Sequence, residues 1–144
     1  MDNYFKISLK SDSQNEKLAR QVIAYFMTEL NPTLEEICDV KTAVSEAVTN
    51  SIVHGYDNLK GTVNITAEIH GKELYIEIED YGRGIDDIEK AREPLYTSQP
   101  EKERSGMGFT VMEAFMDYVD VYSRPGLGTK VIMKKIIGVS DELW

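Results

Sequence analysis

The spacing of hydrophobic residues changes sharply near residue 62, and this change limits the folds that the chain can adopt. Before it, apolar residues recur every three or four positions, which is the spacing of amphipathic helices. After it, apolar and polar residues alternate, which is the spacing of strands with one buried face. The helical positions are Leu18, Val22, Ile23, Phe26 and Leu30, then Ile37, Val40, Val44, Ala47, Val48 and Ser51; the strand positions are Val63, Ile65, Ala67 and Ile69, then Leu74, Ile76 and Ile78.

Local signals mark the ends of the two helices. Asn31-Pro32 ends the first one, because proline lacks an amide donor and restricts the residue before it. Thr33 and Glu36 have the spacing of a capping box, so a second helix is expected to begin there and to stop near Gly55.

The remaining segments complete the order β-α-α-β-β-loop-α-β-β. We expect a strand at residues 5–9, a short acidic helix at 86–92, a helix at 109–116 and two final strands at 118–123 and 129–135. Residues 93–105 are polar and predict a lid over a functional site. This order predicts an α+β fold, an α/β sandwich in which helices gather on one face of an antiparallel or mixed sheet.

Composition narrows the classes of partner. The 144 residues are 42% hydrophobic and predict a single globular domain over residues 1–144. A formal net charge of −9 argues against nucleic acids and anionic membranes as partners, and a phosphorylated ligand would need a local metal ion, amide cradle or helix N-terminus. Cys38 is expected to be buried and unbridged, and the chain, with no leader or membrane span, is expected in the cytoplasm.

Glu46 and Asn50 form the first chemical pattern. They lie one turn apart on the second helix, ~40° apart on the helical wheel and roughly opposite its apolar stripe. Spacing alone also fits a solvated polar face. However, Thr49-Asn50-Ser51 places poor helix formers in mid-helix, which is typical of functional sites. A carboxylate and an amide oxygen so placed suit a general base and a Mg²⁺ ligand.

Three glycine-rich patterns follow. Residues 80–84, Asp-Tyr-Gly-Arg-Gly, place a carboxylate beside backbone that can approach a planar ligand, although such segments are usually turns. Residues 104–108, Arg-Ser-Gly-Met-Gly, precede a helix and can form an anion cradle or a simple loop end. Residues 126–129, Gly-Leu-Gly-Thr, read alone as a hairpin turn.

The order of these patterns is more specific than any one of them. Glu-x-x-x-Asn, Asp-x-Gly-x-Gly, Gly-x-Gly at a helix start and Gly-x-Gly-Thr together resemble the GHKL ATP-binding superfamily of gyrase, Hsp90, histidine kinases and MutL. In that superfamily residues 46–50 would be the N box, 80–84 the G1 box, 104–108 the G2 box and 126–129 the final box. The resemblance implies a Bergerat-type ATP-binding fold.

The resemblance also implies roles for individual residues. Asp80 would accept a hydrogen bond from the adenine amino group, and Asn50 would ligate Mg²⁺. Glu46 would act as general base on a serine hydroxyl, and His54 would either support Asn50 or be buried against Tyr56. The base pocket would be lined by Gly82, Gly84 and Thr129, and the phosphates would be held by Arg104, Ser105, Gly106, Met107 and Gly108.

Residues 45–56, SEAVTNSIVHGY, on a chain of this size, look like those of the bacterial anti-sigma serine kinases. That resemblance implies a homodimer that inhibits a sporulation sigma factor and phosphorylates a serine of an anti-anti-sigma protein with Mg-ATP. Lys17 and Arg20, a basic spot on the first helix opposite Leu18, Val22 and Phe26, would contact a partner or belong to a solvated face. A sigma-binding protein without kinase activity, a plain ATPase and a detached histidine-kinase domain remain alternatives.

Overall fold

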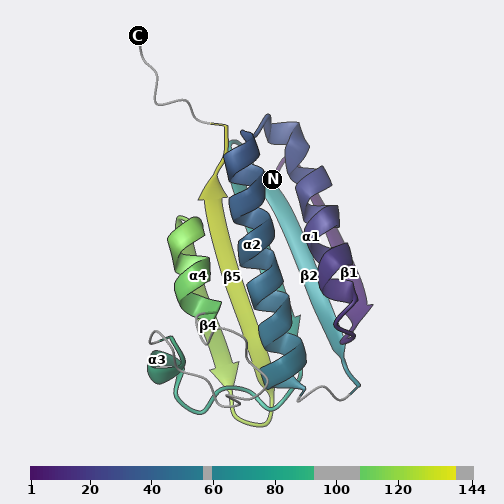
Figure 1. Ribbon diagram of the computed structural model, residues 1–144, viewed down its shortest axis with the longest axis vertical. Coiled ribbons are helices and arrows are strands. Elements are labelled where there is room, and N and C mark those ends of the chain that lie inside the picture. The colour runs from purple at the N-terminus through teal and green to yellow at the C-terminus, as the bar shows by residue number, and fades with distance from the viewer. Residues whose placement is uncertain (57–59, 93–107, 139–144) are drawn as a thin grey trace.

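The computed structural model describes residues 1–56, 60–92 and 108–138 (Figure 1). Within these residues, no helix is both long and apolar enough to cross a membrane. The elements follow in the order β1 (Asn3–Lys10), α1 (Asn15–Phe26), the 3₁₀ turn η1 (Met27–Leu30), α2 (Leu34–Asn50), the π-helical turn η2 (Ser51–Gly55), β2 (Thr62–His70), β3 (Glu73–Asp80), α3 (Ile88–Ala91), α4 (Gly108–Phe115), β4 (Tyr118–Arg124) and β5 (Gly128–Ile136).

The strands form one sheet in the order β1-β2-β3-β5-β4, and each neighbouring pair is antiparallel. Figure 1 shows α1, α2 and α4 side by side over one face of that sheet. The predicted α+β sandwich is therefore confirmed, and all pairs among the described strands are antiparallel rather than mixed. The core lies between the two layers, where α2 buries Val40, Val44 and Ala47 against the buried rows of β2 and β3.

The predicted capping box at the start of α2 is present. The Thr33 hydroxyl accepts from the Glu36 amide at 3.1 Å, and the Glu36 carboxylate accepts from the Thr33 amide at 2.9 Å. The Glu36 carboxylate also accepts from the Gly138 amide at 3.2 Å, so it ties the end of the last strand segment to the helix start. Asn31, with φ of 52°, ends the preceding turn in the left-handed conformation.

Two expectations about the helices are wrong. Cys38 is exposed, because it lies ~160° around the α2 wheel from Val40 and so faces away from the sheet. On α1 the buried side chains are Ala19 and Ile23, whereas Leu18 is 47% exposed. The helix is therefore turned from the expected orientation, because the small Ala19 rather than Leu18 faces α2 and the sheet.

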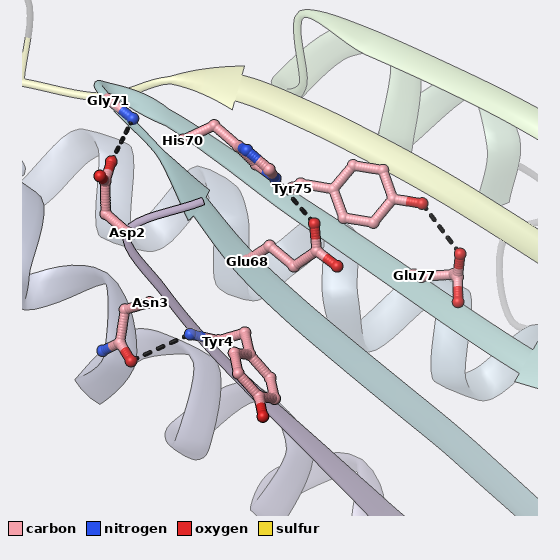
Figure 2. A network of polar contacts seen from close by, with 8 residues as sticks. All are labelled: Asp2, Asn3, Tyr4, Glu68, His70, Gly71, Tyr75 and Glu77. Atoms are coloured by element: carbon pink, nitrogen blue, oxygen red, sulfur yellow. Dashed lines mark hydrogen bonds and ion pairs between the residues drawn. The ribbon is translucent and has the colours of Figure 1, made fainter.

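The sheet face away from the helices carries pairs of polar side chains (Figure 2). The Tyr75 hydroxyl donates to the Glu77 carboxylate at 2.8 Å. The pKa of Tyr75 is raised mainly by burial and, to a smaller extent, by this contact. At the β2–β3 turn, the Asp2 carboxylate accepts from the Gly71 amide at 2.7 Å. That bond fixes the N-terminal segment to the β2–β3 turn, at the end of the sheet opposite Asp80.

Candidate functional site

Three buried rows of the sheet turn from apolar to polar at the same end. On β3 the row Leu74, Ile76 and Ile78 continues to Asp80, and Val131 on β5 continues to Thr129. On β4 the row through Val121 continues to Ser123. Asp80 is paired with Thr129, and Thr129 with Ser123. The register therefore places three polar side chains next to one another, beneath the C-terminal end of α2.

A pocket of about 470 Å³ opens above this polar end. It is lined from above by α2 and η2, from the side by the loop after β3 and the start of α4, and from below by β5. The lining includes Asn50, Ser51, Asp80, Gly84, Gly108 and Thr129. Residues of the N box, G1 box, G2 box and final box thus meet in one cavity.

Asp80 is the one buried charged residue of the described core, with 3% of its surface exposed. Its carboxylate accepts from the Gly82 amide at 2.9 Å and also from the Ser51 hydroxyl and the Thr129 amide. Burial raises the pKa of Asp80 above its usual value, and the three donors only partly oppose that rise. Because a carboxylate offers about four acceptor positions, roughly one remains for a ligand donor.

Ser51 was expected only as part of the buried stripe of α2, yet it is a site residue. It is buried and begins the π-helical turn η2, and its hydroxyl donates to Asp80. A π turn adds one residue to a helical turn, and such turns are frequent at functional sites. No periodicity in the sequence signals this turn, so the contact could not be anticipated.

The two glycines after Asp80 mainly allow close approach of the chain to itself. A side chain on Gly82 would place its Cβ 2.1 Å from the Gly55 carbonyl oxygen, and one on Gly84 would lie 2.1 Å from the Arg124 carbonyl oxygen. Gly84 lines the pocket as expected, but Gly82 does not, because its Cα faces Gly55 and its amide binds Asp80. The approach of Gly82 to a planar ligand stays a prediction.

Arg83 joins the same loop to the end of η2. Its amide donates to the Gly55 carbonyl at 2.8 Å, and its Nε donates to the His54 carbonyl at 2.7 Å. His54 is half-buried and lines the pocket. These two bonds hold the loop after β3 to the end of the helix that carries Asn50.

The helical wheel predicted that Asn50 and Glu46 lie roughly opposite the core stripe, on an open polar face. The structure shows that this face is partly covered. Both are half-buried, and Asn50 lines the pocket while its amide packs against Gly108, where a Cβ would lie 3.0 Å from it. The start of α4 covers this side of α2, which the sequence of α2 alone could not show. Glu46 lies one turn earlier and is not among the lining residues described.

The donor set suits a magnesium ion carried by a nucleotide. Mg²⁺ takes one or two protein oxygens and completes its shell with phosphate and water, and Asn50 offers one amide oxygen. Within the described ranges, no group of three or more His, Cys, Asp or Glu side chains could hold a metal alone. The residues present therefore fit a shared ion rather than a protein-held one.

Several predicted residues lie elsewhere. Arg104, Ser105, Gly106 and Met107, with the expected lid at 93–105, fall outside the described residues, whereas Gly108 begins α4 and is buried at the pocket. Lys17 is exposed on α1 and is not among the lining residues of the pocket. Arg20 is half-buried, not freely exposed, since it pairs with Glu16 one turn earlier at 3.1 Å.

Ser123 is the second site residue that the sequence analysis missed. Its hydroxyl lies 2.8 Å from the Thr129 hydroxyl and accepts from the Ile85 amide at 2.7 Å. Continuing the alternation of Val119 and Val121 by two residues would have found it, because Ser123 has the same parity on β4.

Comparisons with known proteins identify the family of the chain. Residues 9–135 match the family described as histidine kinase-like ATPase domain. A protein named anti-sigma F factor from Clostridium acetobutylicum is 59% identical over 142 residues, covering 99% of both chains. Another of that name from Thermoanaerobacter pseudethanolicus is 56% identical over 136 residues, covering 94% of this chain and 95% of its own.

Solved structures show the same fold at low identity. The crystal structure of the RsbU and RsbW domains of Rv1364c from Mycobacterium tuberculosis aligns with a TM-score of 0.68 and 19% identity, over 94% of this chain and 32% of that one. The catalytic domain of the histidine kinase ThkA aligns with a TM-score of 0.59 and 13% identity, over 94% of this chain and 96% of its own. By sequence and by fold, the chain belongs to the histidine kinase-like ATPase domain family and, within it, to the anti-sigma F factors.

Proposed function

We propose that this chain is an anti-sigma factor that binds Mg-ATP in the pocket above Asp80 and transfers the γ-phosphoryl group to a serine of an anti-anti-sigma protein. The observation that carries the proposal is the buried Asp80 carboxylate with an acceptor position left for a ligand. A buried carboxylate costs stability, as its raised pKa indicates, and such a cost is typical of a binding site. The relatives named anti-sigma F factor support the partner class.

In this proposal the base enters the pocket with its amino group toward Asp80. The carboxylate accepts from that group, while Gly84 and Thr129 border the base. An adenine amino group donates, whereas the oxo group of guanine only accepts and would face the carboxylate unpaired. This difference gives the preference for ATP over GTP.

The phosphates then extend toward Asn50 and the start of α4. Asn50 would hold the magnesium ion, which neutralises phosphate charge when bound. The amides at the beginning of α4, starting with Gly108, together with residues 104–107, would hold the β- and γ-phosphates at the positive end of the helix. These local devices let a chain with a net charge of −9 bind a polyphosphate.

Glu46 would take the proton of the attacking serine hydroxyl. It lies one helical turn from Asn50, on the same helix, so base and metal ligand are positioned by one rigid element. Most of the acceleration would come from positioning and charge neutralisation, with a contribution from the base.

The protein partners are a sigma factor of sporulation and the anti-anti-sigma phosphorylation substrate, bound by a homodimer in the cytoplasm. We assign partner contact to the side of α1 that carries Lys17 and Arg20. This basic spot stands out on an acidic chain, although the ion pair with Glu16 reduces the free charge of Arg20.

The test is phosphate transfer from γ-labelled ATP with Mg²⁺ to the anti-anti-sigma protein. We expect an acid-stable phosphoserine product and a loss of about 10²-fold or more in transfer rate for Glu46→Gln, with ATP affinity nearly unchanged. Glu35→Gln, an exposed change at the other end of α2, is the matched control and should transfer at the wild-type rate.

The alternatives give different results in the same experiment. Release of free phosphate without a labelled protein would indicate a plain ATPase, and an acid-labile product would indicate transfer to histidine. If the chain gives no labelled product, and if sigma binding needs ATP but is unaffected by Glu46→Gln, the chain is a nucleotide-dependent binding protein without kinase activity. Any of these would replace the kinase proposal.

A further inference from the structure

Three polar contacts meet at the hydroxyl of Ser123, on the strand beside Thr129. The Ile85 amide donates to Ser123 Oγ at 2.7 Å. The carbonyl oxygen of Gly128 lies 2.9 Å from that Oγ, and Thr129 Oγ1 lies 2.8 Å from it. Because Ser123 and Thr129 are paired across β4 and β5, the strand register fixes their contact.

Counting protons gives each contact a direction. A serine hydroxyl has one proton and two lone pairs. One lone pair of Ser123 accepts from the Ile85 amide. The other two contacts can both be hydrogen bonds only when the Ser123 proton points to the Gly128 carbonyl, because that oxygen can only accept. The contact with Thr129 is then a hydrogen bond only if Thr129 donates its own proton to the second lone pair of Ser123.

In the arrangement that satisfies all three contacts, Thr129 has no proton left for the pocket that it lines. Its oxygen can offer lone pairs alone. The neighbouring group is the Asp80 carboxylate, paired with Thr129 across β3 and β5, and in its ionised form it also only accepts. Two adjacent groups at the bottom of the pocket accept, and neither of them can donate.

We propose that Ser123 is a positioning residue that orients the Thr129 hydroxyl as an acceptor and thereby sets the choice of nucleotide base. The site selects a base whose polar edge donates, directly or through a water molecule, and rejects one that presents an oxo group. This inference rests on the proposed function, since it concerns the base end of the same ATP pocket. It adds a residue that touches neither nucleotide nor metal.

The experiment compares the affinities of ATP and inosine triphosphate, measured with Mg²⁺ by calorimetry on the full chain. Inosine triphosphate carries an oxo group in place of the amino group and a hydrogen on N1, so the 6-position, which donates in adenine, only accepts. We expect the wild type to prefer ATP by roughly ten- to a hundredfold, as for a site that pairs a polar group. In Ser123→Ala the Thr129 hydroxyl can rotate and donate to the oxo group, so the preference should fall by about fivefold or more.

Ser123→Thr keeps a hydroxyl at this position and should retain the wild-type preference. If Ser123 had only a structural role, Ser123→Ala would weaken the binding of both nucleotides by the same factor. An unchanged ratio of the two affinities would therefore overturn the inference. If Ser123→Ala does not fold, Thr129→Val provides the second test. It removes the acceptor itself, so a preference for ATP as large as in the wild type would also overturn the inference.

The wild-type measurement separates this inference from the proposed function. If the wild type binds neither nucleotide, the ATP proposal fails and the inference falls with it. If the wild type prefers ATP, Ser123→Ala keeps the same ratio and Thr129→Val loses it, only the role of Ser123 is wrong. Equal binding of the two nucleotides by the wild type would refute base selection by the acceptors.

Discussion

Replacing Gly84 by alanine should be far more damaging than replacing Gly126, although both have nearly the same backbone conformation. Their φ angles are +77° and +79°. An alanine in this left-handed region costs about 1–2 kcal/mol at either position. The two sites differ in their surroundings, because a Cβ on Gly126 meets nothing within 4 Å, whereas one on Gly84 would lie 2.1 Å from the Arg124 carbonyl oxygen.

The close contact at Gly84 sets the size of the difference. The loop after β3 must move from the β4–β5 turn by about 1 Å, and overpacking of this kind costs about 1–3 kcal/mol more. Two hydrogen bonds flank the contact: the Gly126 amide donates to the Arg83 carbonyl at 2.6 Å, and the Ile85 amide donates to Ser123 at 2.7 Å. Both would lengthen, and the Asp80 segment would shift relative to Thr129.

Thermal unfolding and ATP calorimetry measure the two effects. We expect Gly84→Ala to be less stable than Gly126→Ala by about 1–3 kcal/mol, which corresponds to roughly 3–10 °C in a chain of this size. ATP affinity should fall by about tenfold or more in Gly84→Ala, since ~1 Å of misplacement is costly in a binding site. Gly71→Ala, with φ of +60° and open space in the β2–β3 turn, should lose stability but not ATP affinity. Equal losses of stability in Gly84→Ala and Gly126→Ala would refute the close-approach argument.

Three further predictions concern charge. Because the pKa of Asp80 is raised in the folded chain, its contribution to stability is full below the unfolded pKa of ~3.9 and is lost as pH rises above it. The free energy of unfolding of Asp80→Asn should therefore gain on that of the wild type as pH rises above about 4, while ATP binding weakens, and a difference independent of pH would contradict the burial argument. Asn50→Ala should lower ATP affinity in Mg²⁺ but have little effect with the metal chelated, and calorimetry showing equal losses in both conditions would remove the metal role. Lys17→Glu should slow association with the sigma factor, and the association rate of the wild type should fall with added salt. Lys72→Glu, an exposed change on the distant β2–β3 turn, is the control. An association rate that responds neither to salt nor to Lys17→Glu would argue against electrostatic steering.

The fold could be predicted because its elements have strong local signals. The alternation in β2 and β3 and the capping box of Thr33 and Glu36 depend on neighbours in the sequence, and all are present. The faces of isolated helices were less predictable. Leu18 and Ala19 differ by one position on α1, and only packing against α2 decides which one is buried.

The site was predictable in its motifs but not in the contacts between them. The four glycine and carboxylate patterns indicated which segments would meet, and described members of all four line one pocket. Ser51 acts through a π turn that has no local signal. The alternation on β4 places Ser123 on the inward face, but its contact with Thr129 depends on pairing with another strand. The roles of Glu46 and Asn50 stay predictions until transfer is measured.

The polar end of the three sheet rows also bears on how much of the chain is folded at a given nucleotide concentration. At Asp80, Thr129 and Ser123 the hydrophobic layer stops short, so a bound base would occupy the place that the next layer of core side chains would otherwise fill. A ligand that binds only the folded chain at a hundred times its dissociation constant adds about 2.7 kcal/mol to the stability. If ATP binds as proposed, it would serve as a removable part of the core, and the melting temperature of the protein would rise with the nucleotide concentration around it.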